Sequence, residues 1–376
     1  MVICVAVVSN RSYLTKGFAN MADNELPAQG NEDRHARAAT ESEPLVQQPM
    51  GAPVLKGKAR AVTGGGTGRK RPGDRVFEFF STISAALITV LVAAIGIFLL
   101  VQATPPLMRN DGGLLGFFTY GGQWQTSNLE TMQFGIPNLF FSTLTISIIA
   151  LIIAMPIALG VALFLSNYAP PALVRPLGTL VDMLAAVPSI VYGLWGAQVL
   201  GPLLGKFYDW VNSWGGGFFL FATYQNSPPF STGRNMMTGG IVLAVMILPI
   251  IAATAREVFV QTPPGQIESA LALGATRWEV IRMTVIPFGM SGFIAGSMLG
   301  LGRALGETMA LYMAVAPANN YRGSLFDGGT TFATAIANAS AEFNNPVSAG
   351  AYIAAGLVLF LLTFVVNSIA RAIVTK

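Results

Sequence analysis

Six apolar segments, each close to the length that crosses a bilayer, constrain this chain more than any other feature of its sequence. About 20 apolar residues span the hydrocarbon core as an α-helix, which satisfies its own backbone hydrogen bonds in lipid. Charged residues make up only 11% of the 376 residues, whereas soluble domains carry roughly 25%. The sequence therefore predicts an all-α polytopic membrane protein with six transmembrane helices. The predicted spans lie near Phe77–Val101, Leu139–Leu165, Leu177–Leu200, Met236–Val258, Phe288–Ala316 and Val347–Ile373.

Residues 22–74, before the first span, are rich in Gly, Pro, Ala and charge, which is typical of a disordered arm. The chain opens on the apolar run MVICVAVV, which is too short to cross a membrane and has no charges before it, so a cleaved signal peptide is not expected. Met21 is an alternative start. We therefore expect a disordered N-terminal arm at 1–74, a first transmembrane helix with an external loop at 75–136, and a transmembrane core at 137–373.

Cysteine and histidine usage excludes several kinds of site. The single cysteine, Cys4, rules out an internal disulfide or a multi-cysteine metal site, and the single histidine, His35, lies in the polar arm. A Ser-His-Asp triad or a histidine-rich metal site is therefore not expected. The sequence predicts a non-catalytic protein that holds no metal and no cofactor of its own.

Basic residues are divided unequally between the two sides of the predicted membrane. One side receives the arm together with Arg175, Arg256, Arg277, Arg282, Arg371 and Lys376, and the other receives Arg109, Lys206, Arg234 and Arg322. Because Lys and Arg accumulate in cytoplasmic loops, both termini are predicted to be cytoplasmic. The external loops, around residues 105–136, 206–235 and 317–346, could receive a solute-binding protein or be simple connections.

The loop between the fourth and fifth spans, residues 256–287, has a helical pattern of its own. Thr262 can cap a first helix, and Gly274 is expected to end that helix in a left-handed conformation. Thr276 and Glu279 have the Ser/Thr-x-x-Glu spacing of a capping box, which predicts a second short helix that Pro287 closes. This pattern fits a helical hairpin that docks a partner, and it also fits an amphipathic loop lying on the lipid surface.

Glycines recur every four residues in the fifth predicted span. Gly292, Gly296 and Gly300 form one such row, and Gly302 and Gly306 form another. Small residues at this spacing let two helix backbones approach closely within a membrane, so helix packing is the favoured interpretation of both rows.

Arg303 and Glu307 are two charges within the same apolar segment, and their spacing of four residues predicts that they lie one helical turn apart, within reach of each other. A charge at the bilayer centre costs roughly 2.5–3.5 kcal/mol on insertion scales and usually faces a cavity or a partner. One interpretation is an internal ion pair that fixes helix packing. The other is a guanidinium in the path of an anion, oriented by Glu307, because the planar fork of arginine can donate two parallel hydrogen bonds to an oxyanion.

Two hydroxyl groups in the third predicted span are further candidates. Ser189 and Tyr192 lie three residues apart and share a helix face. Both can donate a hydrogen bond to an oxyanion, although such residues more often bond a neighbouring helix.

Three sequence motifs resemble one protein family. Glu268-Ser269-Ala270, Gly274 and Ile286-Pro287 resemble the EAA loop of ABC importer permeases, with Ser269 and Thr284 in place of the usual alanine and isoleucine. LGLGRALGETMA and AAVPSIVYGLWG resemble the phosphate-specific, PstC-type branch of that family, rather than its PstA-type partner. The resemblance spans roughly Pro137–Arg371 and leaves the arm uncovered.

The resemblance implies the type I ABC importer permease fold and a place in the cytoplasmic membrane. It implies an ATP-binding subunit dimer that docks on the EAA-like loop, a second homologous permease of the PstA type and an external phosphate-binding protein, with ATP bound by the partner. It assigns coupling to Glu268, Ala270, Gly274, Thr276, Glu279 and Pro287, and raises Arg303, Glu307, Ser189 and Tyr192 as pathway residues. There are two alternatives. The chain is a permease for sulfate, molybdate or another oxyanion, or it is a self-sufficient channel or secondary transporter.

Overall fold

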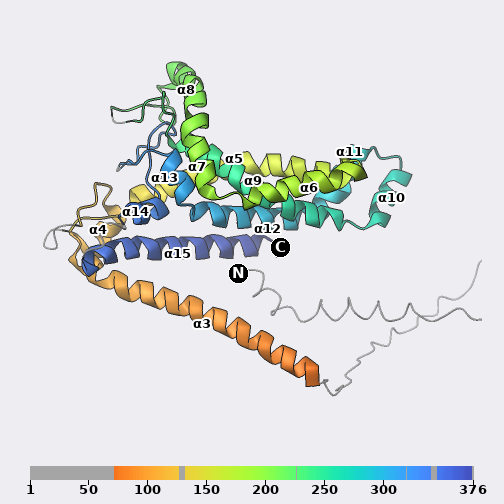
Figure 1. Cartoon of the computed structure of the whole chain (residues 1–376), viewed down its shortest axis with the longest axis horizontal. Coiled ribbons are helices and arrows are strands. Elements are labelled where there is room, and N and C mark those ends of the chain that lie inside the picture. The colour runs from red at the N-terminus through yellow and green to blue at the C-terminus, as the bar shows by residue number, and fades with distance from the viewer. Residues whose placement is uncertain (1–71, 127–131, 226, 319, 340–344, 375–376) are drawn as a thin grey trace, which may run out of the picture. The chain divides into compact units, whose positions relative to one another are not determined.

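The computed structural model describes residues 72–126, 132–225, 227–318, 320–339 and 345–374 (Figure 1). The predicted arm therefore lies almost entirely outside the described residues. The chain forms two compact units, residues 1–94 and 95–376. In the first unit the described residues are the beginning of helix α3, whose large apolar side chains are exposed, including Phe77 and Phe80. Such a surface is suited to lipid or to another membrane helix.

All the described regular structure is helical, as predicted. The helices are α3 (Pro72–Arg109), α4 (Gly113–Thr119), α5 (Pro137–Leu163), α6 (Pro171–Ala186), α7 (Ser189–Trp195), α8 (Gly201–Gly215), α9 (Met236–Val260), α10 (Pro264–Ala272), α11 (Arg277–Val280), α12 (Ile286–Leu305), α13 (Met309–Ala314), α14 (Phe332–Ala339) and α15 (Pro346–Val374). Short π-helical turns at Phe164–Tyr168, Gly196–Leu200 and Ile281–Val285 extend α5, join α7 to α8 and join α11 to α12.

Five of these helical segments are long and apolar enough to cross a membrane: Gly73–Arg109, Pro137–Tyr168, Met236–Val260, Arg277–Leu305 and Pro346–Ala372. A sixth span exists only if α6 and the α7–α8 segment are taken as one broken span, because the two are bent by 89° relative to each other at the break between them. The predicted count of six is therefore reached with one broken helix.

Helix α9 is at the centre of the second unit, and two-thirds of its most apolar window is buried. It packs against α5 and α12, and less extensively against α6. On α5, four alanines spaced by four residues are completely buried: Ala150, Ala154, Ala158 and Ala162. A Cβ atom at Gly240 of α9 would meet the side chain of Ile149 of α5 at 2.5 Å. Small residues on both helices thus bring the two backbones together.

The first glycine row of α12 faces α9, which confirms the packing interpretation for its three members. A Cβ atom at Gly292, Gly296 or Gly300 would collide with Val258, Thr254 or Ile251, respectively. In the second row the interpretation is wrong for Gly306, and Gly302 makes only an ordinary contact with α15. A Cβ atom at Gly302 would come no closer than 3.8 Å to Asn367, and one at Gly306 would meet nothing.

We expect Gly296→Ala to lower the stability of the folded chain by about 1–3 kcal/mol, the usual cost of overpacking. The new methyl group would collide with Thr254, whose hydroxyl is held by the Ile250 carbonyl oxygen at 2.8 Å. Gly160→Ala is the matched control, because its methyl group would meet no atom within 4 Å. The midpoint of thermal unfolding in detergent measures both, and equal midpoints would contradict this packing argument.

Two predicted spans are interrupted. The third, predicted near Leu177–Leu200, breaks where α6 ends at Ala186 and α7 begins at Ser189. Pro188 lies in this break; it lacks an N–H donor and restricts the residue before it to extended geometry. The fifth, predicted near Phe288–Ala316, ends as a helix at Leu305 and resumes as α13 at Met309.

Candidate functional site

The hairpin between α9 and α12 has the local geometry that the sequence predicts. Gly274 follows α10 with φ of +83°, and its N–H donates to the Leu271 carbonyl oxygen at 2.9 Å. Thr276 and Glu279 form the predicted capping box. The Thr276 N–H donates to Glu279 Oε2 at 2.7 Å, and the Glu279 N–H donates to Thr276 Oγ1 at 3.4 Å. The turn is therefore fixed by its own sequence.

Two details of the predicted hairpin are wrong. Thr262 does not cap α10, which begins at Pro264 after Pro263; its hydroxyl donates instead to the Phe259 carbonyl oxygen at the end of α9, at 2.9 Å. Pro287 does not close the second helix. It is the second residue of α12, and the helical path from Arg277 to Leu305 is continuous. The second arm of the hairpin is thus the beginning of a membrane-spanning helix, so a force on the hairpin acts directly on α12.

The hairpin exposes both its predicted coupling residues and several apolar side chains. Glu268, Gly274, Thr276, Glu279 and Pro287 are exposed, and Ala270 is half-buried. The large apolar side chains on this surface are Leu271, Leu273, Trp278 and Met283, of which Leu273 is 89% exposed. An open groove of about 750 Å³ lies between α10 and the start of α12. This surface is suited to a docked protein or to lipid.

The two helix breaks come together inside the second unit. Helix α7 packs on α13, and the contact is closest at Gly193, where a Cβ atom would lie 2.8 Å from Ala310 Cα. The α6–α7 break at Pro188 and the α12–α13 break at Gly306 are therefore joined by a tight helix contact. Discontinuous helices of this kind form substrate sites in membrane transporters, because their free backbone ends face a cavity.

Arg303 and Glu307 do not lie on one helix face, so the single-helix geometry predicted for them is wrong. Arg303 is exposed in the last turn of α12, and Glu307 lies after the helix has ended, 9% exposed. Glu307 Oε1 accepts a hydrogen bond from the Ala310 N–H at 3.1 Å and so holds the start of α13. No ion pair within 4.0 Å joins the two in the part of the chain that the structure describes.

Tyr192 bridges the break in the third span. Its hydroxyl donates to the Leu184 carbonyl oxygen at 2.7 Å, across the α6–α7 bend, which is the neighbouring-helix bond that such residues more often make. Ser189 is half-buried at the first position of α7. All four predicted pathway residues thus lie near one of the two breaks, and Ser189 directly follows Pro188 at the α6–α7 break.

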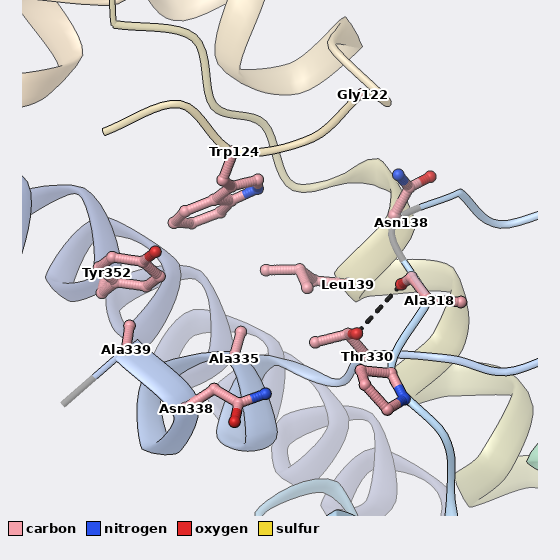
Figure 2. Close-up of a pocket in the computed structure, with 11 residues that line it drawn as sticks. Gly122, Trp124, Asn138, Leu139, Ala318, Thr330, Ala335, Asn338, Ala339 and Tyr352 are labelled. Atoms are coloured by element: carbon pink, nitrogen blue, oxygen red, sulfur yellow. Dashed lines mark hydrogen bonds between the residues drawn. The ribbon is translucent and has the colours of Figure 1, made fainter. Parts of the chain in front are cut away.

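Two cavities lie at the end of α9 and α12 opposite to the hairpin, where Figure 1 shows α13 and α14. The first, of about 330 Å³, is shown in Figure 2, with the Trp124 and Tyr352 rings on one side and Asn138 and Thr330 on the other. The second, of about 340 Å³, is lined by Arg234 and residues of α13 and α14. Sequence reasoning missed both, because their linings come from segments far apart in the chain.

A comparison with protein families decides the identity of this fold. Residues 155–376, more than half of the chain, match the family described as "Binding-protein-dependent transport system inner membrane component". The chain belongs to this permease family. With five or six candidate spans, this permease is a multi-pass membrane protein.

Curated relatives match this permease over most of their length. "Phosphate transport system permease protein PstC 2" of Mycobacterium tuberculosis is 51% identical over 304 residues, which cover 81% of this chain and 92% of the relative. "Phosphate transport system permease protein PstC" of Mycobacterium leprae is 49% identical, covering 80% and 92%. The protein of the same description from Pasteurella multocida is 41% identical, covering 75% and 88%.

Proposed function

We propose that this permease is a membrane subunit of an ATP-driven importer that carries inorganic phosphate across the cytoplasmic membrane. The relatives described as phosphate transport permeases support the substrate, and the family supports a transport role that depends on a binding protein. The observation that carries the proposal is the position of Arg303 beside two broken membrane helices.

Arg303 supplies a positive charge next to the α12–α13 break, and a positive charge stabilises an anion within the membrane. The two breaks remove continuous helix from this region. The planar guanidinium of arginine can donate two parallel hydrogen bonds to two oxygens of a phosphate. Glu307 acts here as a positioning residue, because it fixes α13 through the Ala310 N–H and leaves Arg303 without a fixed carboxylate.

The exposure of Arg303 in this chain supports a pathway shared with a second permease. An exposed guanidinium facing lipid would be costly, so an adjoining protein surface or an aqueous path must cover it. A homologous permease of the PstA type would complete this path. One modest site suffices in the membrane, because tight capture belongs to an external phosphate-binding protein and a deep site would slow release.

The hairpin couples the permease to an ATP-binding subunit dimer, which binds the nucleotide; this chain needs no cofactor. Leu273, 89% exposed, and Trp278, 57% exposed, supply an apolar docking surface around the rigid Gly274 turn. Because the second arm continues into α12, movement of the ATPase is transmitted along the helix that carries Arg303. This arrangement requires the hairpin and both termini to be cytoplasmic.

The substrate is tested by competition. Cells that lack other phosphate importers, and that produce this permease with its partners, should accumulate labelled phosphate. Excess unlabelled phosphate should abolish the uptake of label, and excess sulfate or molybdate should leave it unchanged. Equal or stronger competition by sulfate or molybdate would reassign the substrate to another oxyanion.

A further inference from the structure

Arg234 lines the second cavity, at the end of α9 opposite to the hairpin. It precedes α9, and the rest of the cavity wall comes from α13, the Pro317 region and the Gly329–Asn338 segment. The cavity has a volume of about 340 Å³, and no described residue that lines it is acidic. Thr330, Thr334 and Asn338 provide polar groups beside the guanidinium. The charge of this cavity is therefore positive, with neutral polar neighbours.

The guanidinium of Arg234 is held in place but is only partly used. Its Nη2 donates to the carbonyl oxygens of Tyr312 at 3.3 Å and Val315 at 3.4 Å, both at the end of α13. Its Nε is buried with no partner, and Nη1 has none among the described residues. Arginine carries five N–H donors, so two long contacts made by one nitrogen leave most of its capacity free. A residue serving only as a helix cap would not need the unused donors.

Two neutral side chains beside Arg234 can complete an anion site. Asn338 is exposed, lines both cavities and has no hydrogen-bond partner in the described structure, so its amide can donate. The Thr330 hydroxyl donates to the Ala318 carbonyl oxygen at 3.0 Å, a bond that Figure 2 shows, and this fixes one wall of the cavity. The site is small, and its lining combines these polar groups with the apolar side chains of Leu311 and Met313.

Helix α13 links this cavity to the region of Arg303. Its start is held by Glu307 through the Ala310 N–H, and its end is held by Arg234. Six helical residues span about 9 Å, so only this short distance separates the two ends of α13. An anion at Arg234 would lie one short helix away from the break that Arg303 adjoins.

We propose that Arg234 and its cavity form an outer site for inorganic phosphate, which receives the anion before it reaches Arg303. The proposal rests on the function proposed above and adds a second positive site in series with the first. Two weak sites in series attract the anion and still let it leave. A single strong site would trap it. Under the orientation proposed above, the outer site faces the side where a binding protein releases its cargo.

The first test compares Arg234→Gln with Arg234→Lys in the assembled importer. Gln keeps an N–H donor for the Tyr312 and Val315 carbonyls but removes the charge, and Lys keeps the charge. We expect Gln to reduce the rate of phosphate uptake about tenfold, the effect of losing one charge-assisted hydrogen bond, and Lys to keep most of the rate. Arg322→Gln is the control, because Arg322 lies over the Tyr224 ring at 4.8 Å and does not line the cavity. Normal uptake by Arg234→Gln, or equal losses with Gln and Lys, would overturn the proposal.

The second test measures binding without transport. Met313, half-buried in the cavity wall, is changed to Cys in a chain whose only cysteine, Cys4, is replaced by Ser. In the complex without nucleotide, millimolar inorganic phosphate should slow modification of Met313→Cys by a maleimide, and adding Arg234→Gln should remove this protection. Absence of protection in a complex that imports phosphate would refute the outer site alone. Protection in a complex that imports no phosphate would refute the proposed function and leave an anion site.

Discussion

Phosphate uptake should fall at least about a hundredfold in an Arg303→Gln importer, while the complex still assembles. The estimate follows from losing a bidentate, charge-assisted contact in a desolvated path, worth about 3 kcal/mol. Arg303 is exposed at the end of α12 and makes no ion pair with Glu307 in the described structure, so its removal leaves no buried partner charge behind. Labelled phosphate uptake measures the loss, and co-purification of the other subunits measures assembly.

Arg303→Lys is the matched variant for this prediction. Lysine keeps the positive charge but loses the planar fork, so uptake should be reduced and not abolished. Normal uptake by the Gln variant would remove Arg303 from the mechanism. Loss of assembly in the Gln variant would instead support the alternative interpretation, in which this charge fixes helix packing.

The second large effect is expected at the hairpin turn. Gly274→Asp should release the ATPase from the permease or uncouple ATP hydrolysis from uptake. Gly274 has φ of +83°, a backbone conformation that costs roughly 1–2 kcal/mol for a residue with a Cβ atom. Nothing lies within 4 Å of the position a Cβ atom would take, so the new carboxylate would project from the docking surface itself. Co-purification of the ATPase and its stimulated hydrolysis rate measure the effect.

Gly274→Asn separates the two causes. Asn has nearly the shape of Asp, carries no charge and tolerates left-handed backbone better than most residues. We expect Asn to retain much of the coupling that Asp removes. Full co-purification and full stimulated hydrolysis with the Asp variant would count against docking at this turn, and would favour the interpretation of the hairpin as a loop lying on lipid.

Local sequence signals predicted the hairpin turn well, because the interactions that form it are local. Gly274 supplies its own left-handed turn, and Thr276 and Glu279 bond each other across three residues. Thr262 failed as a cap because a closer carbonyl, that of Phe259, takes its hydroxyl. A pattern names a residue that can cap a helix, but the surrounding chain decides which group it bonds.

The helix breaks were harder to predict, because they depend on packing between distant segments. Pro188 accounts for a break in the third span, but the 89° bend and the close packing of α7 on α13 at Gly193 involve segments far apart in the chain. The end of α12 at Leu305 carried no proline signal at all. The spacing of Arg303 and Glu307 therefore suggested a helical pair that the structure replaces with a capped break.

Within a uniformly apolar span, the sequence also does not show which residues pack against another helix. Ala150, Ala154, Ala158 and Ala162 form a buried row in α5, but within a uniformly apolar span they do not stand out. In the sequence, Arg234 stands out only as one of the basic residues predicted on the external side. Its cavity appears when the Tyr312–Val315 and Gly329–Asn338 segments fold around it.

We expect this permease to move an anion past a membrane guanidinium only when a separate ATP-hydrolysing protein drives its hairpin. Transport can be measured in vesicles that contain the two permeases, with the phosphate-binding protein supplied outside and with or without the ATP-binding subunit. Phosphate should accumulate against a gradient only when that subunit and ATP are both present. Accumulation against a gradient by vesicles without the ATP-binding subunit would contradict it.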